Sequence, residues 1–260
     1  MSSDDTGRMP NALATTALGV DDVTGPRGAP VLRHVTLSVP CGGSHVVLGP
    51  MHSGKSTLVR LVLGLDRAES GRVTIDGSTF DADRATEDQL RHVRRRVGVV
   101  FDSSALVSRL TILENVTLPL AEHTTVAADR ARATAVGLLH EVGVVGDLER
   151  TPDRLTRLDR RRAALARALV LEPAVLLVDE PGNGLDPHAA AELDETMQAL
   201  HERYRCAVLI CSQEVRYAFH WPTAVSVLAN GRIVEQGSLD DLLNSRHEAV
   251  RRFVDRRGAA

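Results

Sequence analysis

The sequence predicts an α/β fold with a mainly parallel core sheet, and two patterns carry this prediction. Four short apolar runs have the length and composition of strands that are buried on both faces of a sheet. Segments with helical periodicity separate these runs, as the right-handed crossovers between parallel strands require. The predicted strands are Val46–Leu48, Val97–Phe101, Ala174–Val178 and Cys206–Cys211.

The helices between these strands are predicted from apolar spacing and from helix-start signals. Thr111 and Glu114 have the spacing of a capping box, which places a helix start inside a mainly helical region from Ser103 to Val145. Two short helices are expected to finish the chain. The remaining predicted helices cover Ser56–Leu63, about Arg160 to Leu171, and His188 to about Arg203.

Antiparallel strands are predicted at both ends of this arrangement. Residues 30–39 alternate apolar and polar side chains before a turn at Cys41-Gly42-Gly43, which is typical of an early antiparallel strand. Near the C-terminus, Val225–Leu228 and Arg232–Glu235 flank Asn230-Gly231, a residue pair that favours a tight hairpin.

The chain length fits one domain with a smaller subdomain, because 260 residues can bury one sizeable core. We expect a disordered tail over residues 1–16 and a single domain over 17–237. Within that domain, a helical subdomain is expected over about 103–160. A helical extension is expected over 238–260, and we interpret its arginines as a solvated helix face rather than a lipid-binding or partner-binding surface.

The composition is that of a globular protein, with 43% hydrophobic and 25% charged residues. The formal net charge of -3 gives no broad attraction to nucleic acid or anionic lipid. The sequence starts with no secretory signal or transit peptide, and no apolar run approaches the ~18 residues that span a bilayer. If the protein serves a membrane, another chain must therefore form the pore. Cys41, Cys206 and Cys211 lack metal-ligand spacing and are expected to be reduced core residues.

A phosphate-binding loop is the strongest motif in the chain. The pattern G-x-x-x-x-G-K-S stands between a predicted strand and a predicted helix, which is the context that its mechanism requires. Backbone N–H groups and the helix N-terminus favour phosphate there, Lys55 reaches the β and γ phosphates, and Ser56 offers a hydroxyl to Mg²⁺. The predicted nucleotide-binding residues are Gly49, Pro50, Met51, His52, Ser53, Gly54, Lys55, Ser56 and Thr57.

Two acidic residues end the apolar strand 174–178, at the edge of the sheet where ligands bind. Asp179 is predicted to hold the magnesium shell, because hard cations prefer oxygen ligands, and Glu180 to polarise an attacking water. ATP and Mg²⁺ are therefore the expected ligands.

With these motifs, the chain resembles the ATP-binding cassette ATPases from about Val20 to Gly237. Gly184-Leu185-Asp186 is similar to the family's D-loop, and residues 165–169 are similar to the helix after its signature motif. The segment Val97–Leu120 resembles the cassettes of Mce and Mla lipid transporters. The resemblance implies a P-loop NTPase fold with an N-terminal antiparallel portion, transmembrane permease partners, a second cassette in a homo- or heterodimer, and a cytoplasmic location on the inner face of the membrane.

Three positions depart from the family pattern. Asp102 stands where the Q-loop glutamine is expected; it could ligate Mg²⁺, but its charge would repel a γ-phosphate unless the metal lies between them. Gln213 replaces the switch histidine and can donate one hydrogen bond, but it cannot carry the histidine's charge. The region 24–28 lacks the aromatic residue that stacks on adenine in the family, and Pro26 is the candidate apolar surface.

The signature motif, which in the family contacts ATP on the opposite subunit, is a further departure. Both of its glycines are replaced, and side chains at these positions are expected to obstruct close approach. Asp159 could itself cap the following helix and compete with a phosphate, whereas Arg157 could offer a charge. The positions that resemble dimer-interface residues are Thr156, Arg157, Leu158, Asp159 and Asp186.

Three hypotheses follow from this combination of motifs that match the family and positions that depart from it. The first is a transporter subunit that hydrolyses ATP with unusual but working residues, and the second is a cassette that binds MgATP without hydrolysing it. The third, a soluble cassette acting on DNA or translation, is disfavoured because the chain has neither a second cassette nor a long insertion. No nucleic-acid partner is expected.

Overall fold

The computed structural model describes residues 16–28, 31–221 and 224–254. Its core sheet has the strand order β10-β9-β3-β8-β7-β6, and all neighbours are parallel except β9 and β10. The prediction of a mainly parallel sheet is therefore confirmed. The strands are β3 (Ser44–Leu48), β6 (Val97–Val100), β7 (Val175–Asp179), β8 (Ala207–Ser212), β9 (Ala224–Ala229) and β10 (Arg232–Gly237).

A second, antiparallel sheet has the order β2-β1-β4-β5 and confirms the predicted N-terminal antiparallel portion. Sequence reasoning located only one of its members, the strand over residues 30–39. β1 begins at the last residue assigned to the predicted tail, and residues 1–15 of that tail lie outside the described part of the chain. The strands are β1 (Thr16–Gly25), β2 (Leu32–Pro40), β4 (Ser70–Ile75) and β5 (Ser78–Asp81).

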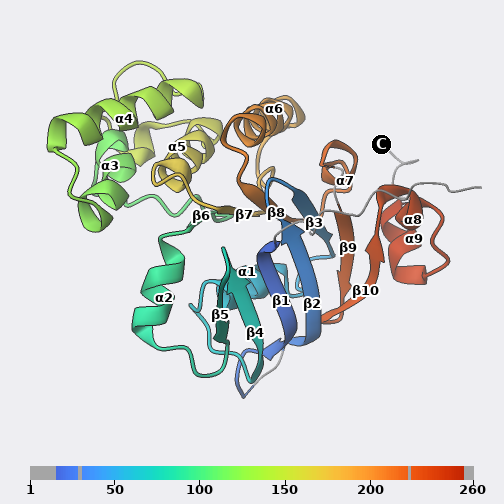
Figure 1. Ribbon diagram of the computed structural model, residues 1–260. Coiled ribbons are helices and arrows are strands. Elements are labelled where there is room, and N and C mark those ends of the chain that lie inside the picture. Colours follow the sequence, from blue (N-terminus) through green and yellow to red (C-terminus); the bar gives the residue numbers. More distant parts are fainter. Residues whose placement is uncertain (1–15, 29–30, 222–223, 255–260) are drawn as a thin grey trace, which may run out of the picture.

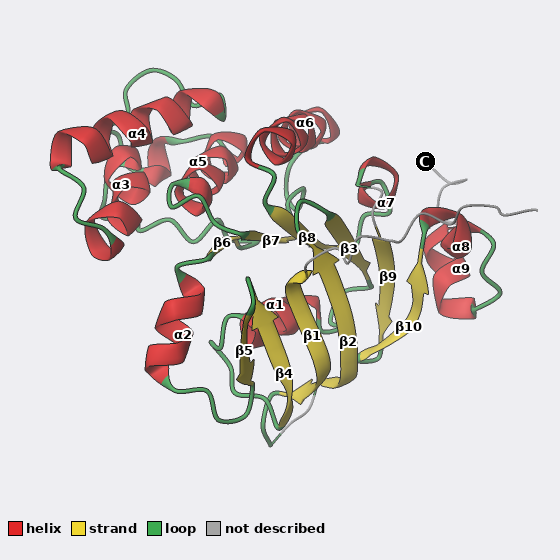
Figure 2. Ribbon diagram, viewed as in Figure 1, coloured by secondary structure: helices red, strands yellow, loops and turns green. Residues whose placement is uncertain are grey.

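The helices cover both faces of the core sheet, and α3, α4 and α5 form a lobe at one end of it (Figure 1; Figure 2). The capping box predicted at the start of α3 is present. α5 runs past residue 160, so the predicted subdomain boundary falls inside a helix. The α-helices are α1 (Lys55–Val62), α2 (Glu87–Arg94), α3 (Ile112–His123), α4 (Ala128–Glu141), α5 (Arg157–Leu169), α6 (Pro187–Tyr204), α7 (Tyr217–His220), α8 (Leu239–Leu243) and α9 (Glu248–Val254).

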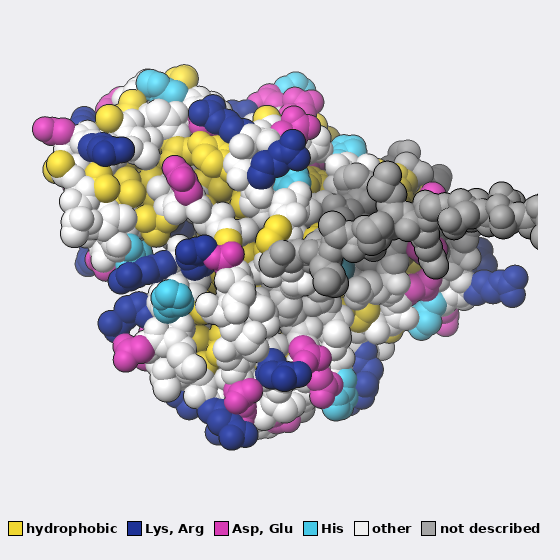
Figure 3. Space-filling view, in the orientation of Figure 1, with side chains coloured by type: hydrophobic (Ala, Val, Ile, Leu, Met, Phe, Trp, Pro, Cys, Tyr) yellow, Lys and Arg dark blue, Asp and Glu magenta, His cyan; other side chains and the backbone are white. Residues whose placement is uncertain are grey.

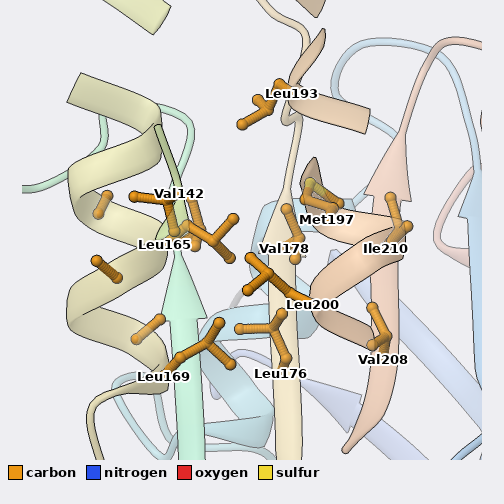
Figure 4. Close-up of a cluster of buried hydrophobic side chains, with 14 of the residues drawn as sticks. Val142, Leu165, Leu169, Leu176, Val178, Leu193, Met197, Leu200, Val208 and Ile210 are labelled. Carbon is orange, nitrogen blue, oxygen red and sulfur yellow. The ribbon is translucent and has the colours of Figure 1, made fainter. Parts of the chain in front are cut away.

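Alternating side chains of the core sheet point into two separate hydrophobic cores. On β3, Val46 and Leu48 pack into the core shared with α5 and α6, whereas Val47 packs into the core shared with α1 and the antiparallel sheet. Figure 4 shows the first of these cores, where side chains of β7 and β8 meet those of α5 and α6. The sheet is buried on both faces, which explains why its strands read as continuous apolar runs.

The β9–β10 hairpin forms at the predicted Asn230-Gly231 pair. Both residues have positive φ, 49° and 74°, as a tight hairpin turn of this type requires. A Cβ on Gly231 would lie 1.8 Å from the carbonyl oxygen of Val31, so the turn also passes too close to β2 for any other residue.

The expectation for the cysteines is wrong at one position. Cys206 and Cys211 are buried and free, but Cys41 is exposed in the turn between β2 and β3. Cys206 directly precedes β8 and Cys211 lies within it. Burial raises the pKa of the Cys206 thiol to about 11.

A buried histidine on β3 predicts that stability depends on pH. His45 is fully buried, with Nδ1 3.0 Å from the Ser38 carbonyl oxygen and Nε2 2.7 Å from the Ser226 hydroxyl. Burial lowers the pKa of His45 below its ordinary value of 6.5, although the Ser38 hydrogen bond opposes this. Below pH 6.5 the unfolded chain binds a proton that the folded chain resists, so the free energy of unfolding should fall as the pH drops through that value.

Urea unfolding from pH 8 to pH 5 checks this expectation. His45→Gln should make stability less dependent on pH below 6.5, at the cost of lower stability at pH 8. The control is His92→Gln on α2, where the side chain is exposed. Equal pH dependence in the wild type and His45→Gln would contradict the assignment.

Candidate functional site

The loop between β3 and α1 forms the floor of a cavity of about 500 Å³. Gly54, the residue before α1, has a φ of 111°, and a Cβ there would lie 2.4 Å from the Leu32 side chain. Glycine is therefore required at this position. No side chain among the described residues caps the start of α1, which leaves the first-turn N–H groups for a ligand.

Lys55 is buried at the base of this cavity, with 5% of its side chain exposed. Its ammonium donates to the carbonyl oxygens of Gly49 and Pro50 at 2.8 and 2.9 Å and lies 3.1 Å from Glu180 Oε1. Lys55 is also the only lysine in the 260-residue sequence. The cavity therefore holds a positive charge fixed in position by its own loop.

Asp179 and Ser56 offer oxygen ligands side by side. Asp179 is buried at the end of β7, and its carboxylate accepts a hydrogen bond from the Ser56 hydroxyl. Burial raises the pKa of Asp179; the Ser56 hydrogen bond opposes this, while the charges of Glu180 and Asp102 add to it. Asp179 Oδ1 is buried without a hydrogen-bond partner among the described residues. An orphaned carboxylate oxygen next to a hydroxyl fits Mg²⁺, which binds few protein oxygens and completes its shell with phosphate and water.

Glu180 directly follows β7 and is held from two sides. Its Oε1 faces Lys55, and its Oε2 accepts hydrogen bonds from the Gln213 backbone N–H at 3.0 Å and from the Ser212 hydroxyl at 3.3 Å. The contact from Gln213 thus comes from its backbone, while its side chain lines the cavity. Ser212 is a partner of Glu180 that sequence reasoning missed.

Asp102 lines the same cavity, but its carboxylate has protein partners. Arg161 on α5 donates to Oδ1 at 2.9 Å, and the Asn183 amide donates to both oxygens at 3.0 and 3.1 Å. Sequence reasoning assigned Asp102 to Mg²⁺ and singled out neither Arg161 nor Asn183. Arg161 lies between two other arginines in the sequence, so nothing in the pattern distinguishes the buried one.

Among the described residues, no Phe, Tyr or Trp side chain lines this cavity; Val31 lines it, and Pro26 does not. The cavity brings together nine of the predicted site residues, whereas the signature positions lie elsewhere. Of the residues predicted for the site, those that line it are Met51, His52, Gly54, Lys55, Ser56, Thr57, Asp102, Glu180 and Gln213.

The signature positions form the start of α5, three residues earlier than predicted. Thr156 is the N-cap, and its hydroxyl accepts from the Asp159 N–H at 3.0 Å. The expectation that Asp159 caps this helix is therefore wrong, because it lies in the first turn. Arg157 donates to the Gly184 carbonyl oxygen at 3.1 Å, and Leu158 packs against the hydrophobic core.

Asp186 caps α6, accepting from the N–H groups of His188 and Ala189, each at 3.0 Å. The hydrogen bond from Ala189 is the main cause of the lowered pKa of Asp186, and the one from His188 adds to it. Asp186 is exposed, as are Thr156 and Arg157. These three residues are accessible to a second chain.

The sheet and the loop define a P-loop nucleotide-binding protein. More specifically, the chain belongs to the ABC transporter family, whose domain matches residues 32–183. It is 34% identical to the "Probable ribonucleotide transport ATP-binding protein mkl" of Mycobacterium leprae over 96% of this chain and 71% of that protein. It is 37% identical to the "Methionine import ATP-binding protein MetN 1" of Rhodopseudomonas palustris over 86% of this chain and 59% of that protein.

Among solved structures, the fold is similar to that of the dimeric ATP-binding cassette MJ0796, determined in a post-hydrolysis state with bound ADP and Pi. The TM-score is 0.77 at 26% identity, over 85% of this chain and 98% of that one. The family and the fold class predicted from the motifs are thus confirmed. Among the described residues, no helix is both long and apolar enough to cross a membrane.

Proposed function

We propose that this chain is the subunit of an ABC transporter that binds MgATP in the cavity above Lys55. The observation that carries the proposal is the buried lysine, held at 3.1 Å from Glu180 within a glycine-bounded loop at a helix N-terminus. Phosphate oxygens would replace the loop carbonyls as acceptors for Lys55, and the N–H groups at the start of α1 would bind the same phosphates.

Ser56 and Asp179 would hold the metal. When bound, Mg²⁺ supplies charge neutralisation between the phosphates and Asp179. Glu180 would accept a proton from an attacking water, and the hydrogen bonds from Ser212 and the Gln213 N–H that orient its carboxylate support this role. Gln213 can donate one side-chain hydrogen bond to a terminal phosphate.

A second candidate is a cassette that binds MgATP and does not hydrolyse it, with a structural or regulatory role in the transporter. Three residues favour it: Arg157 and Leu158 stand where the family has glycines that expose the backbone, and Gln213 stands where the family has a side chain able to carry charge. Since ABC cassettes pair head to tail, a symmetric dimer would repeat each substitution at both sites.

Permease subunits and a second cassette are the proposed partners, with the chain peripheral on the inner face of the membrane. Hydrophobic side chains gather on the surface of the lobe formed by α3, α4 and α5 (Figure 3). Half-buried Leu106, Val107, Leu110 and Leu118 belong to the segment between β6 and the end of α3. A permease segment docked on this lobe would contact the segment that follows Asp102 in the sequence.

The proposed cargo is a lipid of the kind carried by Mce and Mla transporters, and Mce-type substrate-binding components are further candidate partners. This rests on the likeness of Val97–Leu120 to those cassettes. The names of the relatives refer instead to ribonucleotide transport and methionine import, so transport assays with all three classes of cargo are the discriminating measurement.

A lysine-directed ATP probe tests nucleotide binding in this cavity. An acyl-phosphate derivative of ATP acylates an amine near the bound phosphates, and Lys55 is the only lysine side chain available. We expect peptide mapping to find the label on Lys55 and excess MgATP to reduce it at least tenfold. Lys55→Arg is the control and should leave only N-terminal amine labelling. Labelling that MgATP does not reduce would contradict the proposal.

A further inference from the structure

Arg161 is a charged side chain buried between the two loops that border the nucleotide cavity. It lies on α5, and 5% of its side chain is exposed. Its guanidinium donates to the Phe101 carbonyl oxygen at 2.6 Å, to Asp102 Oδ1 at 2.9 Å and to the Asn183 carbonyl oxygen at 3.2 Å. A buried guanidinium needs an anionic partner, and Asp102 is the carboxylate that contacts it.

Asp102 separates two cavities. On one side it lines the cavity that contains Lys55 and Glu180, and on the other it lines a polar cavity of about 370 Å³ with Arg157 and Arg160. Its side chain is 46% exposed, so Arg161 and Asn183 cover only part of the carboxylate. Its charge also reaches the metal-binding side of the cavity, where it contributes to the raised pKa of Asp179.

A bare carboxylate at this place would oppose the binding of a polyphosphate. Lys55 reaches the terminal phosphates of a bound nucleotide, and Asp102 lines the same cavity. Like charges within one cavity repel each other strongly when water is partly excluded, whereas a carboxylate paired with a guanidinium presents no net charge. The ion pair would thus let an acidic residue occupy a position where the family resemblance predicts a neutral glutamine.

We propose that Arg161 is a positioning residue for the nucleotide: it neutralises Asp102 and turns the carboxylate toward α5, so that the cavity accepts the terminal phosphate of ATP. The inference rests on the proposed nucleotide-binding function and adds to it a residue outside the phosphate loop. It also ties the loop after β6 to α5, so that displacement of either element changes the charge facing the phosphate.

The test measures the affinity for MgATP and for MgADP by calorimetry. In Arg161→Gln the dissociation constant for MgATP should rise at least tenfold and that for MgADP less than threefold, because only ATP places a phosphate beside Asp102. Asp102→Asn should bind MgATP at least threefold more tightly than the wild type. The double variant Arg161→Gln, Asp102→Asn should return to within threefold of the wild type.

Arg167→Gln is the matched control. Arg167 lies on the same helix and donates to the carbonyl oxygens of Ser104 and Ala105 in the same loop, so it shares the structural contacts without a carboxylate partner at the cavity. Its ratio of ATP to ADP affinity should match the wild type even if the protein is less stable.

Three results would overturn the inference. The first is Arg161→Gln with wild-type MgATP affinity, and the second is a double variant as weak as Arg161→Gln, which would leave Arg161 a purely structural role. The third result is measured in Asp102→Asn, which replaces Arg161→Gln if that variant does not fold. An unchanged ratio of MgATP to MgADP affinity in Asp102→Asn would contradict the inference. A wild-type chain that binds neither nucleotide would instead refute the proposed function itself.

Discussion

Replacing Lys55 by alanine is expected to weaken MgATP binding on the order of 100-fold. Lys55 is the buried cation that two loop carbonyls and Glu180 hold at the base of the cavity. Truncating one partner of a buried, hydrogen-bonded charge pair costs about 3 kcal/mol, which corresponds to this loss of affinity. Calorimetric titration of the purified chain with MgATP measures it.

The matched control for Lys55→Ala is Arg84→Ala. Arg84 is exposed and paired with Asp83 away from the cavity, and either substitution takes the formal net charge from -3 to -4. Arg84→Ala should leave the affinity unchanged, which separates the local contact from the overall charge. Lys55→Arg should be intermediate, because the bulkier guanidinium keeps the charge but does not fit the space of the ammonium. Unchanged affinity in Lys55→Ala would remove the basis of the proposed function.

The core sheet could be predicted from the sequence, whereas most of the antiparallel sheet could not. Strands such as β7 and β8 are buried on both faces, so continuous apolar runs identify them. β4 and β5 are half exposed and pair through Thr74 and Thr79, whose mixed polarity gives only a weak strand signal. The start of α5 was also misplaced, because Thr156 rather than Asp159 is its N-cap.

At the candidate site, the sequence predicts local motifs better than long-range partners. Gly54, Lys55 and Ser56 are consecutive residues at the start of α1, so sequence spacing alone links them. Arg161, in contrast, meets Asp102 across 59 residues. Only the packing of α5 against the end of β6 brings these two residues together. No local sequence pattern predicts this contact.

Restoring the family residues at three positions is expected to raise ATP turnover at least tenfold. The changes are Gln213→His, Arg157→Gly and Leu158→Gly, and the wild type is expected to release phosphate at least tenfold more slowly than a consensus cassette. A preorganised donor to the developing charge is worth about 3 kcal/mol, or on the order of 100-fold in rate. Two glycines in the first turn of α5 cost about 1 kcal/mol each in helix stability, and Arg157→Gly also removes the hydrogen bond to Gly184.

Steady-state phosphate release measures this effect, in the purified chain and with its permease partners. Adding Glu180→Gln to the triple variant should return the rate to the background, which shows that the activity belongs to this cavity. A wild-type rate within the ordinary enzyme range of about 1 to 1,000 per second would rule out the non-hydrolysing cassette. If the triple variant binds MgATP normally and is no faster than the wild type, the substitutions at Gln213 and the signature positions do not limit turnover.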